Sequence, residues 1–550
     1  MTAGAQDELV REGCDALAAA DWGHARSCFE QARDLGERPD VLDGLSRALH
    51  FQRDYPQAIE LTERAFVAYR ELGRVVEAAD TARRLAFLHG TINGNMAVAS
   101  GWMARAETLL ADAEECAGHG WLVLDRAPFT DDAADRERLA ASALAIARRH
   151  GDADLEYDAL ALLGEAHVAG GRVDAGMKLI DEAMTAVSAG EVTGVVPVGD
   201  IFCRLLSACE IALDVVRAEQ WMSVAGQFEA WSDFVSPVCR NHYGGILVAV
   251  GRWAEAEAEL LAAIRTFESG YRAMRGSPLV KLADLRVRQG RLDEARHLLE
   301  GSEFHPVARR ALATIALARG ETALAEDLVR LCLEGAGGSD PACAPALDLL
   351  VQVRLARGDA AAAAEAAARL ADIASASGDG RAAAFADLAA GRVEAARGDE
   401  RAASRLQAAL RSFASLDSPL EAARAQLELA RALAGTAPEA AIAEARLALA
   451  AFERIGATGD ADSASAFLRG LGARGRAWPK AYGALTKRET EVLSLLAAGC
   501  SNADIAGRLV ISRRTAEHHV ASILSKLNLR TRSEAAAYAL RDAATRPVVE

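Results

Sequence analysis

A repeated pattern of small and large apolar residues constrains the fold of this chain more than any other feature. Residues 21–32 read DWGHARSCFEQA and residues 54–65 read DYPQAIELTERA, so an aromatic residue and two alanines recur with an offset of 33 residues. Repeats built from helical hairpins have a period of about 34 residues. The same pattern follows Gly251-Arg252-Trp253 and Gly290-Arg291-Leu292, and weaker copies start at Gly171, Gly320, Gly358 and Gly398.

The pattern has a specific physical meaning. An alanine lets two antiparallel helices approach closely, a large apolar residue fills the space beside it, and a Gly-Arg or Gly-Asp pair turns the chain. One hairpin cannot bury its own apolar face, but stacked neighbours can. Alanine is abundant and favours helix over strand. We therefore expect an all-α fold in which residues 1–469 form a tetratricopeptide-like α-solenoid with a concave surface.

The repeats are not perfectly regular. Their spacing drifts between about 30 and 40 residues, whereas a strict repeat would keep one period. One large irregular helical domain is therefore the alternative. We expect loops to interrupt the repeats around residues 89–101, 117–134 and 189–200.

The cysteines and the N-terminus indicate a cytoplasmic location. The nine cysteines are scattered without any Cys-x-x-Cys pair, which is typical of reduced cysteines that fill a core. The chain begins without a basic segment followed by an apolar one, and it has no long uncharged apolar run. We expect neither secretion nor contact with a membrane.

The C-terminal region differs from the rest of the chain in charge. Residues 470–484 read GLGARGRAWPKAYGA, contain no apolar periodicity and are interpreted as a linker. Residues 481–550 contain 10 Lys and Arg residues against 7 Asp and Glu residues, although the whole chain carries a net charge of -16. This asymmetry favours a polyanion-binding domain, which we place at residues 485–545, attached to an acidic body.

Helix start and stop signals divide this domain into four helices. Thr486 and Glu489 form a capping box for the first helix, which ends at Gly499. The second helix starts at Ser501 or Asn502 and continues to Leu509. A third helix, capped by Ser512, covers about residues 513–527, and a fourth begins near Ser533. The second and third helices make a helix-turn-helix candidate.

The third helix has two contrasting faces. Its core face contains Ala516, Val520, Ile523, Leu524 and Leu527. The opposite face carries small and polar residues, which a helix in the major groove of DNA needs because bulky residues would hold it away from the bases. The candidate DNA-binding residues are Asn502, Ser512, Arg513, Arg514, Thr515, Glu517, His518, His519, Ala521, Ser522, Ser525 and Lys526.

Each of these residues has another interpretation. Adjacent histidines diverge by about 100° around a helix, so His518 and His519 do not make a zinc site, and we expect no metal in this domain. His519 lies closer to the core margin, where packing or a phosphate contact is the alternative to reading a base. Arg513 and Arg514 oppose the helix dipole at a helix start, which suggests that an anionic partner compensates.

The C-terminal domain resembles the LuxR-type helix-turn-helix family. The resemblance implies that the third helix enters the major groove and that the fourth supports pairing of two domains. The matching residues are Leu485-Thr486, Arg488-Glu489, Glu491-Val492-Leu493, Ala498-Gly499, Ser501-Asn502, Ile505-Ala506, Leu509, Ile511-Ser512, Thr515, His519-Val520, Ile523-Leu524, Lys526-Leu527, Arg532 and Glu534-Ala535.

The body is similar to the tetratricopeptide-like N-terminal regions of LuxR-type regulators. This similarity covers most of the chain but is diffuse, and it supports the architecture more than the identity of a ligand. It includes residues 101–106, residues 119–122 and residues 203–209.

The chain also departs from the family pattern at three positions. Family members commonly have valine at the position of Ala516, lysine at that of Glu517 and sometimes a basic residue at that of Ala521. Glu517 could accept a hydrogen bond from cytosine, which would alter the sequence specificity. It could equally form an ion pair with Arg513 or Arg514 along the helix.

Several other classes of protein lack their motifs here. The chain contains no Gly-Lys pair for a phosphate-binding loop, and no G-x-S-x-G, H-E-x-x-H or dinucleotide motif. The N-terminal part is helical, whereas a phosphorylated receiver domain would alternate strands and helices. We expect no enzyme, no ATP switch and no cofactor.

Two hypotheses follow for the function. The first is a sequence-specific transcriptional regulator whose solenoid acts as sensor, dimerisation region or docking region. The second is a peptide- or protein-binding solenoid scaffold with weak or vestigial DNA binding. The expected partners are double-stranded DNA, a second copy of the chain, RNA polymerase, and a peptide, protein or small-molecule effector on the solenoid.

Overall fold

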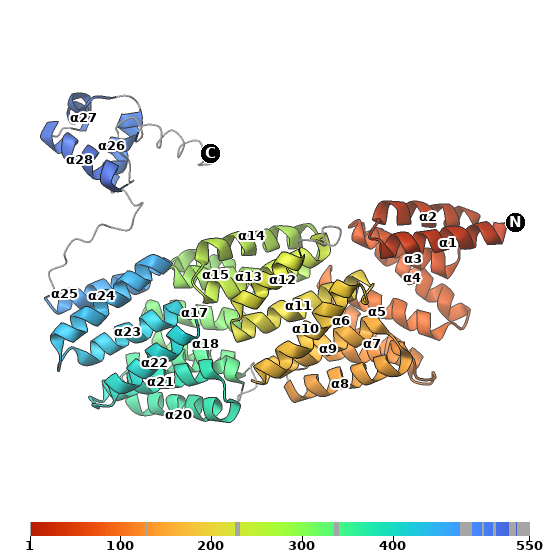
Figure 1. Cartoon of the computed structure of the whole chain (residues 1–550), viewed down its shortest axis with the longest axis horizontal. Coiled ribbons are helices and arrows are strands. Elements are labelled where there is room, and N and C mark those ends of the chain that lie inside the picture. Colours follow the sequence, from red (N-terminus) through yellow and green to blue (C-terminus); the bar gives the residue numbers. More distant parts are fainter. Residues whose placement is uncertain are drawn as a thin grey trace. The chain divides into compact units, whose positions relative to one another are not determined.

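The computed structural model describes residues 2–127, 130, 133–225, 232–334, 340–472, 487–497, 500–509, 513–526 and 535. Within these residues every regular element is a helix, which confirms the all-α prediction. The chain divides into two compact units, Met1–Ala464 and Ser465–Glu550 (Figure 1). We refer to the helices up to α25 as the repeat body.

The helices of the repeat body follow one another with short connections. The first half contains α1 (Thr2–Ala18), α2 (Trp22–Leu35), α3 (Pro39–Phe51), α4 (Tyr55–Glu71), α5 (Val75–Thr91), α6 (Met96–Leu110), α7 (Ala117–Arg126), α8 (Ala133–His150), α9 (Ala153–Ala169), α10 (Val173–Ala189), α11 (Val195–Ala212) and α12 (Val215–Ala225). The second half contains α13 (Ser232–Ala249), α14 (Trp253–Ser269), η3 (Arg272–Arg275), α15 (Gly276–Arg288), α16 (Leu292–Leu298), α17 (Pro306–Ala318), α18 (Thr322–Glu334), η4 (Pro341–Cys343), α19 (Ala344–Ala356), α20 (Ala360–Ser377), α21 (Gly380–Ala396), α22 (Ala402–Ser415), α23 (Pro419–Leu433), α24 (Pro438–Ile455) and α25 (Thr458–Gly470).

The turns inside the hairpins lie where the sequence pattern predicts them. The glycines that mark the later repeats have left-handed backbone, with φ from 69° to 83°, a conformation that side-chain-bearing residues rarely adopt. In each of the first two repeats an aspartate caps the second helix of the hairpin. Asp21 accepts a hydrogen bond from the backbone N–H of His24 at 3.0 Å, and Asp54 does the same for Gln57 at 3.5 Å.

The repeat body buries its apolar residues between stacked hairpins. From α1 to α24 each helix packs against its neighbours in the chain, and alternate helices such as α9 and α11 or α19 and α21 also contact each other. Fully buried alanines, among them Ala25, Ala58 and Ala256, lie at the close helix crossings that the repeat pattern predicted. This stacking is the α-solenoid of tetratricopeptide-like repeats.

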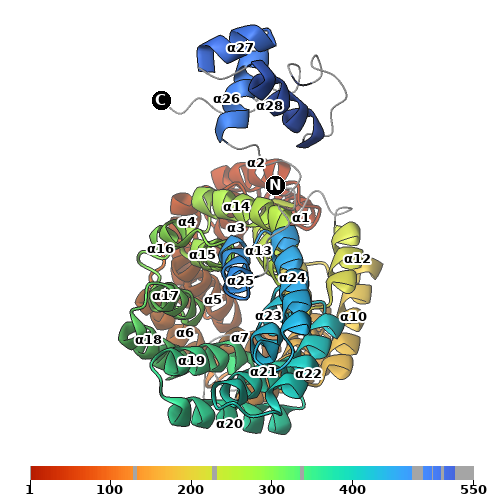
Figure 2. The same cartoon turned by 90° about the vertical axis from the view of Figure 1, so that its left-hand side faces the viewer.

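The solenoid winds tightly enough for segments distant in sequence to touch. The Tyr271 hydroxyl lies 2.7 Å from His50 Nε2, and Arg288 donates to Glu421 over 3.2 Å. Thr458 Oγ1 also donates to the backbone carbonyl of Gln289. The paired residues are 133 to 221 positions apart. The helices therefore wind around a common axis (Figure 2) and successive turns bind each other.

The three stretches that we expected to be loops are largely helical. Helix α5 continues to Thr91, α6 starts at Met96, α7 occupies Ala117–Arg126 and α11 starts at Val195. The expectation was wrong for residues 117–126, where glycines at 118 and 120 obscure the pattern. The Gly120 position lies against Leu155 and Ile146, so a small residue is needed there for close helix packing.

The described part of the C-terminal unit contains three further helices. They are α26 (Lys487–Ala497), α27 (Asn502–Leu509) and α28 (Arg513–Lys526). The proposed linker beyond residue 472, the caps at Thr486 and Ser512, the end at Gly499 and the fourth helix near Ser533 lie outside the described residues. No helix among the described residues is both long and apolar enough to span a membrane.

Candidate nucleic-acid interface

Helices α26, α27 and α28 enclose a small apolar core of their own. Val492 from α26, Ile505 from α27 and Ile523 from α28 are fully buried, and Ala516 is buried at the first turn of α28. Val520 is also buried, and Leu524 packs against the same core. The predicted core face of the third helix is confirmed for these residues, while Leu527 lies outside the described residues.

The start of α27 is fixed by side-chain hydrogen bonds. Ser501 Oγ accepts from the backbone N–H of Asp504 at 3.2 Å, and Asp504 Oδ2 accepts from the backbone N–H of Ser501 at 2.8 Å. This reciprocal arrangement is a capping box, and it makes Ser501 the cap and Asn502 the first helical residue. The sequence left both residues open as helix starts, although the Ser-x-x-Asp spacing could have distinguished them.

A buried carboxylate holds α28 against α26. Glu489 is only 4% exposed, and one of its oxygens accepts a hydrogen bond of 2.7 Å from Ser522 Oγ. The sequence placed Glu489 in a capping box and Ser522 among the DNA-binding candidates. No local pattern connects two residues that are 33 positions apart. Ser522 thus has a structural partner in addition to its proposed contact.

The first turn of α28 presents charged and polar side chains to solvent. Arg513 Nε donates to Glu517 Oε1 over 3.1 Å, and the side chains of the two residues are 73% and 49% exposed. Of the two interpretations of Glu517, the helical ion pair is therefore present in the structure. Thr515 is exposed and His519 is half-buried. The pair partly neutralises the cation that would oppose the dipole at the helix start.

The structure describes only some of the predicted site residues in full. Arg513, Thr515, Glu517, His519 and Ser522 lie on α28, and half-buried Asn502 begins α27. The side chains of Arg514, His518, Ala521, Ser525 and Lys526 lie outside the described residues, although all five positions fall within α28. Ser512 lies wholly outside them. The direct role of each residue in DNA binding stays a prediction.

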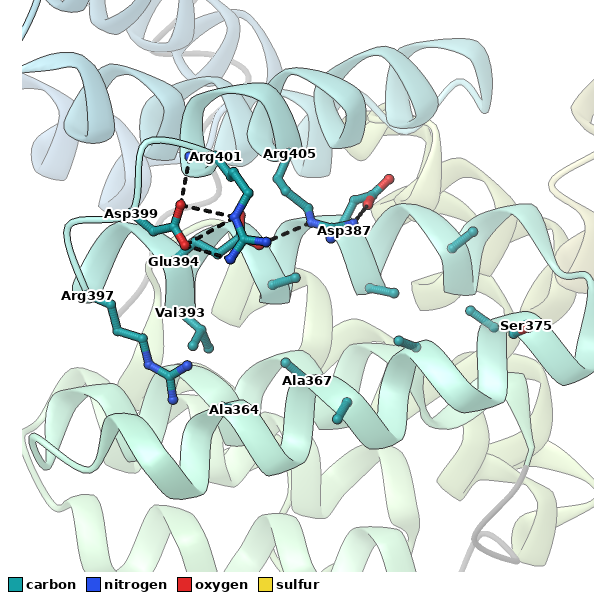
Figure 3. Close-up of a pocket in the computed structure, with 16 residues that line it drawn as sticks. Ala364, Ala367, Ser375, Asp387, Val393, Glu394, Arg397, Asp399, Arg401 and Arg405 are labelled. Atoms are coloured by element: carbon teal, nitrogen blue, oxygen red, sulfur yellow. Dashed lines mark hydrogen bonds and ion pairs between the residues drawn. The ribbon is translucent and has the colours of Figure 1, made fainter.

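The repeat body contains a separate pocket beside α20, α21 and α22 (Figure 3). Its volume is about 460 Å³, and alanines from α20 and α21 form an apolar lining. Arg405 donates to Asp387 over 3.2 Å and to Glu394 over 3.3 Å at its rim. The second carboxylate oxygen of Glu394, Oε2, is buried and has no hydrogen-bond partner. The pocket therefore combines an apolar lining with charged groups at its rim.

The fold and the site together define the class of protein. A helical-repeat body is joined to a small domain whose α27 and α28 are arranged as a helix-turn-helix candidate. Residues 483–539 match the family model described as "Bacterial regulatory proteins, luxR family". The C-terminal domain of this chain is a LuxR-family domain, as the sequence resemblance predicted.

Named relatives match a stretch of similar length, about a tenth of the chain. The oxygen regulatory protein NreC of Staphylococcus epidermidis is 47% identical over 57 residues, which are 10% of this chain and 26% of NreC. The transcriptional regulatory protein LiaR of Bacillus subtilis is 47% identical over 58 residues, which are 10% of this chain and 28% of LiaR. The match thus covers about a quarter of the length of these relatives.

Most of the chain also aligns with one chain of a solved structure, the APC/C hetero-tetramer Cut9-Hcn1. The TM-score is 0.44 with 14% sequence identity, over 84% of this chain and 96% of that one.

Proposed function

We propose that this chain is a sequence-specific DNA-binding transcriptional regulator in which α28 enters the major groove. One observation carries the proposal. Ala516, Val520 and Ile523 hold one side of α28 in the core of a LuxR-family domain, while Arg513 and Thr515 at its start remain exposed. A helix held in this way can place its N-terminal residues against base edges. The names of the relatives, which are regulatory proteins, support the same function.

The proposal assigns different roles to the residues of α28. We assign base reading to Arg514, His518, Ala521 and Ser525, which the helical periodicity of the sequence assigns to the face opposite the core. The same periodicity assigns Arg513, Thr515, His519 and Lys526 to the margins of that face, where phosphate contacts are favoured. Ser512 and Asn502 contribute backbone or phosphate contacts at the helix starts.

The affinity for DNA that a regulator needs favours binding as a dimer. A single domain with a handful of phosphate contacts loses affinity steeply with salt, and two linked copies on two half-sites compensate for that loss. We therefore propose that the chain binds DNA as a homodimer. Analytical ultracentrifugation with and without the bound DNA fragment measures this directly.

The DNA-binding proposal is tested by selecting binding sites from random DNA with the full chain. We expect one enriched motif, and Arg514→Ala and His518→Ala to weaken binding to it by about 1–3 kcal/mol each. Arg446→Ala, which removes an exposed arginine of α24, is the matched control and leaves affinity unchanged. Absence of any enriched motif, or equal loss in the control, contradicts the proposal.

The repeat body is proposed to sense a small-molecule effector in the pocket beside α20, α21 and α22. Its volume lies in the range of small-molecule sites, and its alanine lining lies beside the charged groups of Arg405, Asp387 and Glu394. Ala371 lines the pocket and is exposed, so Ala371→Trp fills the space without disturbing the core.

The sensing proposal predicts that DNA affinity changes when a small-molecule extract of the host cells is added. We expect this change in the parent chain and not in Ala371→Trp, with equal DNA affinity in the two proteins without extract. If the extract affects both proteins equally, the pocket is not the effector site. The partner-binding scaffold remains the second candidate, and intact effector binding in a chain without specific DNA binding would favour it.

A further inference from the structure

Three side chains with metal-binding atoms converge on the first hairpin of the repeat body. Glu12 comes from α1, and His24 and Cys28 come from α2. One ligand atom from each residue lies within 4.8 Å of the other two. His24 Nε2 is 3.0 Å from Glu12 Oε1 and 3.7 Å from Cys28 Sγ.

These separations match those of ligands around one tetrahedral ion. Zinc binds imidazole nitrogen at about 2.0–2.1 Å, carboxylate oxygen at about 2.0–2.2 Å and thiolate sulfur at about 2.3 Å. At a tetrahedral angle, two such ligand atoms lie about 3.4–3.6 Å apart. The two distances from His24 lie on either side of this value, and the third pair of ligand atoms, from Glu12 and Cys28, lies within 4.8 Å.

The positions on the helix favour the same conclusion. His24 and Cys28 are four residues apart on α2, and residues with this spacing share one helix face. Two metal ligands on one helix use this spacing because a single turn brings both donors to one ion. Glu12 reaches the pair from the antiparallel helix α1, so the cluster joins both helices of the hairpin.

Exposure of the cluster gives an ion a path to the site. The side chains of His24 and Glu12 are 50% and 52% exposed, whereas Cys28 is only 2% exposed. An ion would thus enter from the solvent side and bind the sulfur at the floor of the site. The core role that we expected for the cysteines needs no polar neighbour, and it does not explain why the imidazole lies beside this sulfur.

We propose that Glu12, His24 and Cys28 form a binding site for a divalent cation of borderline softness, zinc above all, with a water as fourth ligand. On binding, the Cys28 thiol gives its proton to solvent and the thiolate bonds to the ion. The site acts as a link between α1 and α2. Because its ligands come from both helices, a bound ion stabilises the packing of this hairpin.

The experiment uses the full chain after removal of metals with a chelator. We expect one equivalent of cobalt(II), as a spectroscopic substitute for zinc, to give the absorption of a thiolate bonded to cobalt. Cys28→Ser loses this absorption. Cys14→Ser, which removes an exposed cysteine of the same hairpin, retains it. Zinc affinity, measured by competition with a coloured chelator, falls at least tenfold in His24→Ala and Glu12→Gln.

Zinc is also expected to slow amide exchange in α1 and α2 of the parent chain and not in Glu12→Gln. Because Glu12 is exposed, Glu12→Gln tests the site even if a substitution of buried Cys28 impairs folding. The proposal is overturned if cobalt gives no thiolate absorption, if Cys14→Ser removes the absorption, or if zinc binds Glu12→Gln as tightly as the parent.

Discussion

At the scale of single residues, the hydrogen bond between Ser522 and Glu489 fixes the position of α28. Replacing Ser522 with alanine removes a donor from a carboxylate that is 4% exposed. A hydrogen bond to a charged group contributes about 1.5–3 kcal/mol, so we expect Ser522→Ala to destabilise the C-terminal domain by about that amount. Hydrogen exchange of the α26 and α28 amides in the full chain measures the loss.

Ser522→Thr is the control for this prediction because it keeps the hydroxyl group. If Ser522 acts mainly on DNA, Ser522→Ala weakens DNA binding and leaves exchange unchanged. Equal exchange rates in the parent and Ser522→Ala would therefore contradict the structural role.

Breaking the ion pair between Arg513 and Glu517 should change DNA binding while leaving the stability of the domain nearly unchanged. Both side chains are exposed, so we expect Glu517→Gln to change the stability by no more than about 0.5 kcal/mol. The substitution releases Arg513 and removes a negative charge from the proposed interface. DNA affinity at low salt should rise, and the dependence of log affinity on log salt should steepen by about one phosphate contact.

Fluorescence anisotropy at several salt concentrations measures both quantities for Glu517→Gln. Glu453→Gln, which neutralises an exposed carboxylate of α24, is the control for the change in net charge alone. If both variants bind DNA equally well, the change in affinity comes from the net charge of the chain, and Glu517 does not face the DNA. A loss of affinity in Glu517→Gln would instead favour direct contact of the carboxylate with a base.

At the scale of elements, the sequence predicts what depends on nearby residues. The periodic residues Ala516, Val520 and Ile523 identify the core face of α28, and the glycines with left-handed backbone mark the turns of the body. Both signals act within one or two helical turns. The contact of Ser522 with Glu489 could not be predicted, because it depends on how two helices cross.

The packing of α9 against α11 also could not be predicted from the sequence. Asp158 on α9 is 1% exposed and accepts from Arg204 on α11 over 2.8 Å. Asp200, one turn before Arg204, is half-buried nearby. Burial and then the neighbouring Asp158 raise the pKa of Asp200 to about 8, and Arg204 only partly opposes them. The order of charged residues along α11 does not show that Asp200 and Arg204 lie close to Asp158 on α9.

The raised pKa of Asp200 makes stability depend on pH. The folded chain holds the proton of Asp200 more tightly than the unfolded chain, whose pKa is near 3.8. Stability should therefore fall as the pH rises from about 4 to about 8. Asp200→Asn removes this loss, so we expect it to be more stable than the parent at pH values above 8 and similar below 4.

Urea unfolding at a series of pH values measures this effect, with Asp158→Asn as the contrasting variant. Asp158→Asn leaves Arg204 without its closest carboxylate and should destabilise the body at neutral pH. If Asp200→Asn is less stable than the parent at pH values above 8, the ionised Asp200 stabilises the folded chain and the predicted dependence is wrong.

At the scale of the whole repeat body, contacts between successive turns change how the chain should unfold. A solenoid held only by neighbouring repeats unfolds in parts, because its stability is a sum of local terms. Here Arg288 on α15 donates to Glu421 on α23, and both side chains are at least nine-tenths buried. The superhelical pitch that brings them together is the sum of small rotations at every hairpin, so no single stretch of sequence encodes it.

The pair of Arg288 and Glu421 should therefore couple helices that are far apart in the chain. Leaving a buried charge unpaired costs about 3–5 kcal/mol. Arg288 also donates to Asp284 over 2.8 Å, so we expect Glu421→Ala to destabilise both α15 and α23 by less than this. In the parent chain the amides of α15 and α23 should therefore show the same free energy of opening in hydrogen exchange. In Glu421→Ala, α23 should open at lower urea than α15, since the contact across 133 residues is lost.

Hydrogen exchange at increasing urea, read for each helix, measures this coupling. Glu439→Ala on α24 is the matched control, because Glu439 is exposed and its loss leaves the contact between turns intact. Independent opening of α15 and α23 already in the parent would show that the turns touch without stabilising each other. Joint opening in the parent and in Glu439→Ala, with separation in Glu421→Ala alone, means that the turns fold as one cooperative unit. A ligand bound to one turn could then affect the stability of the next.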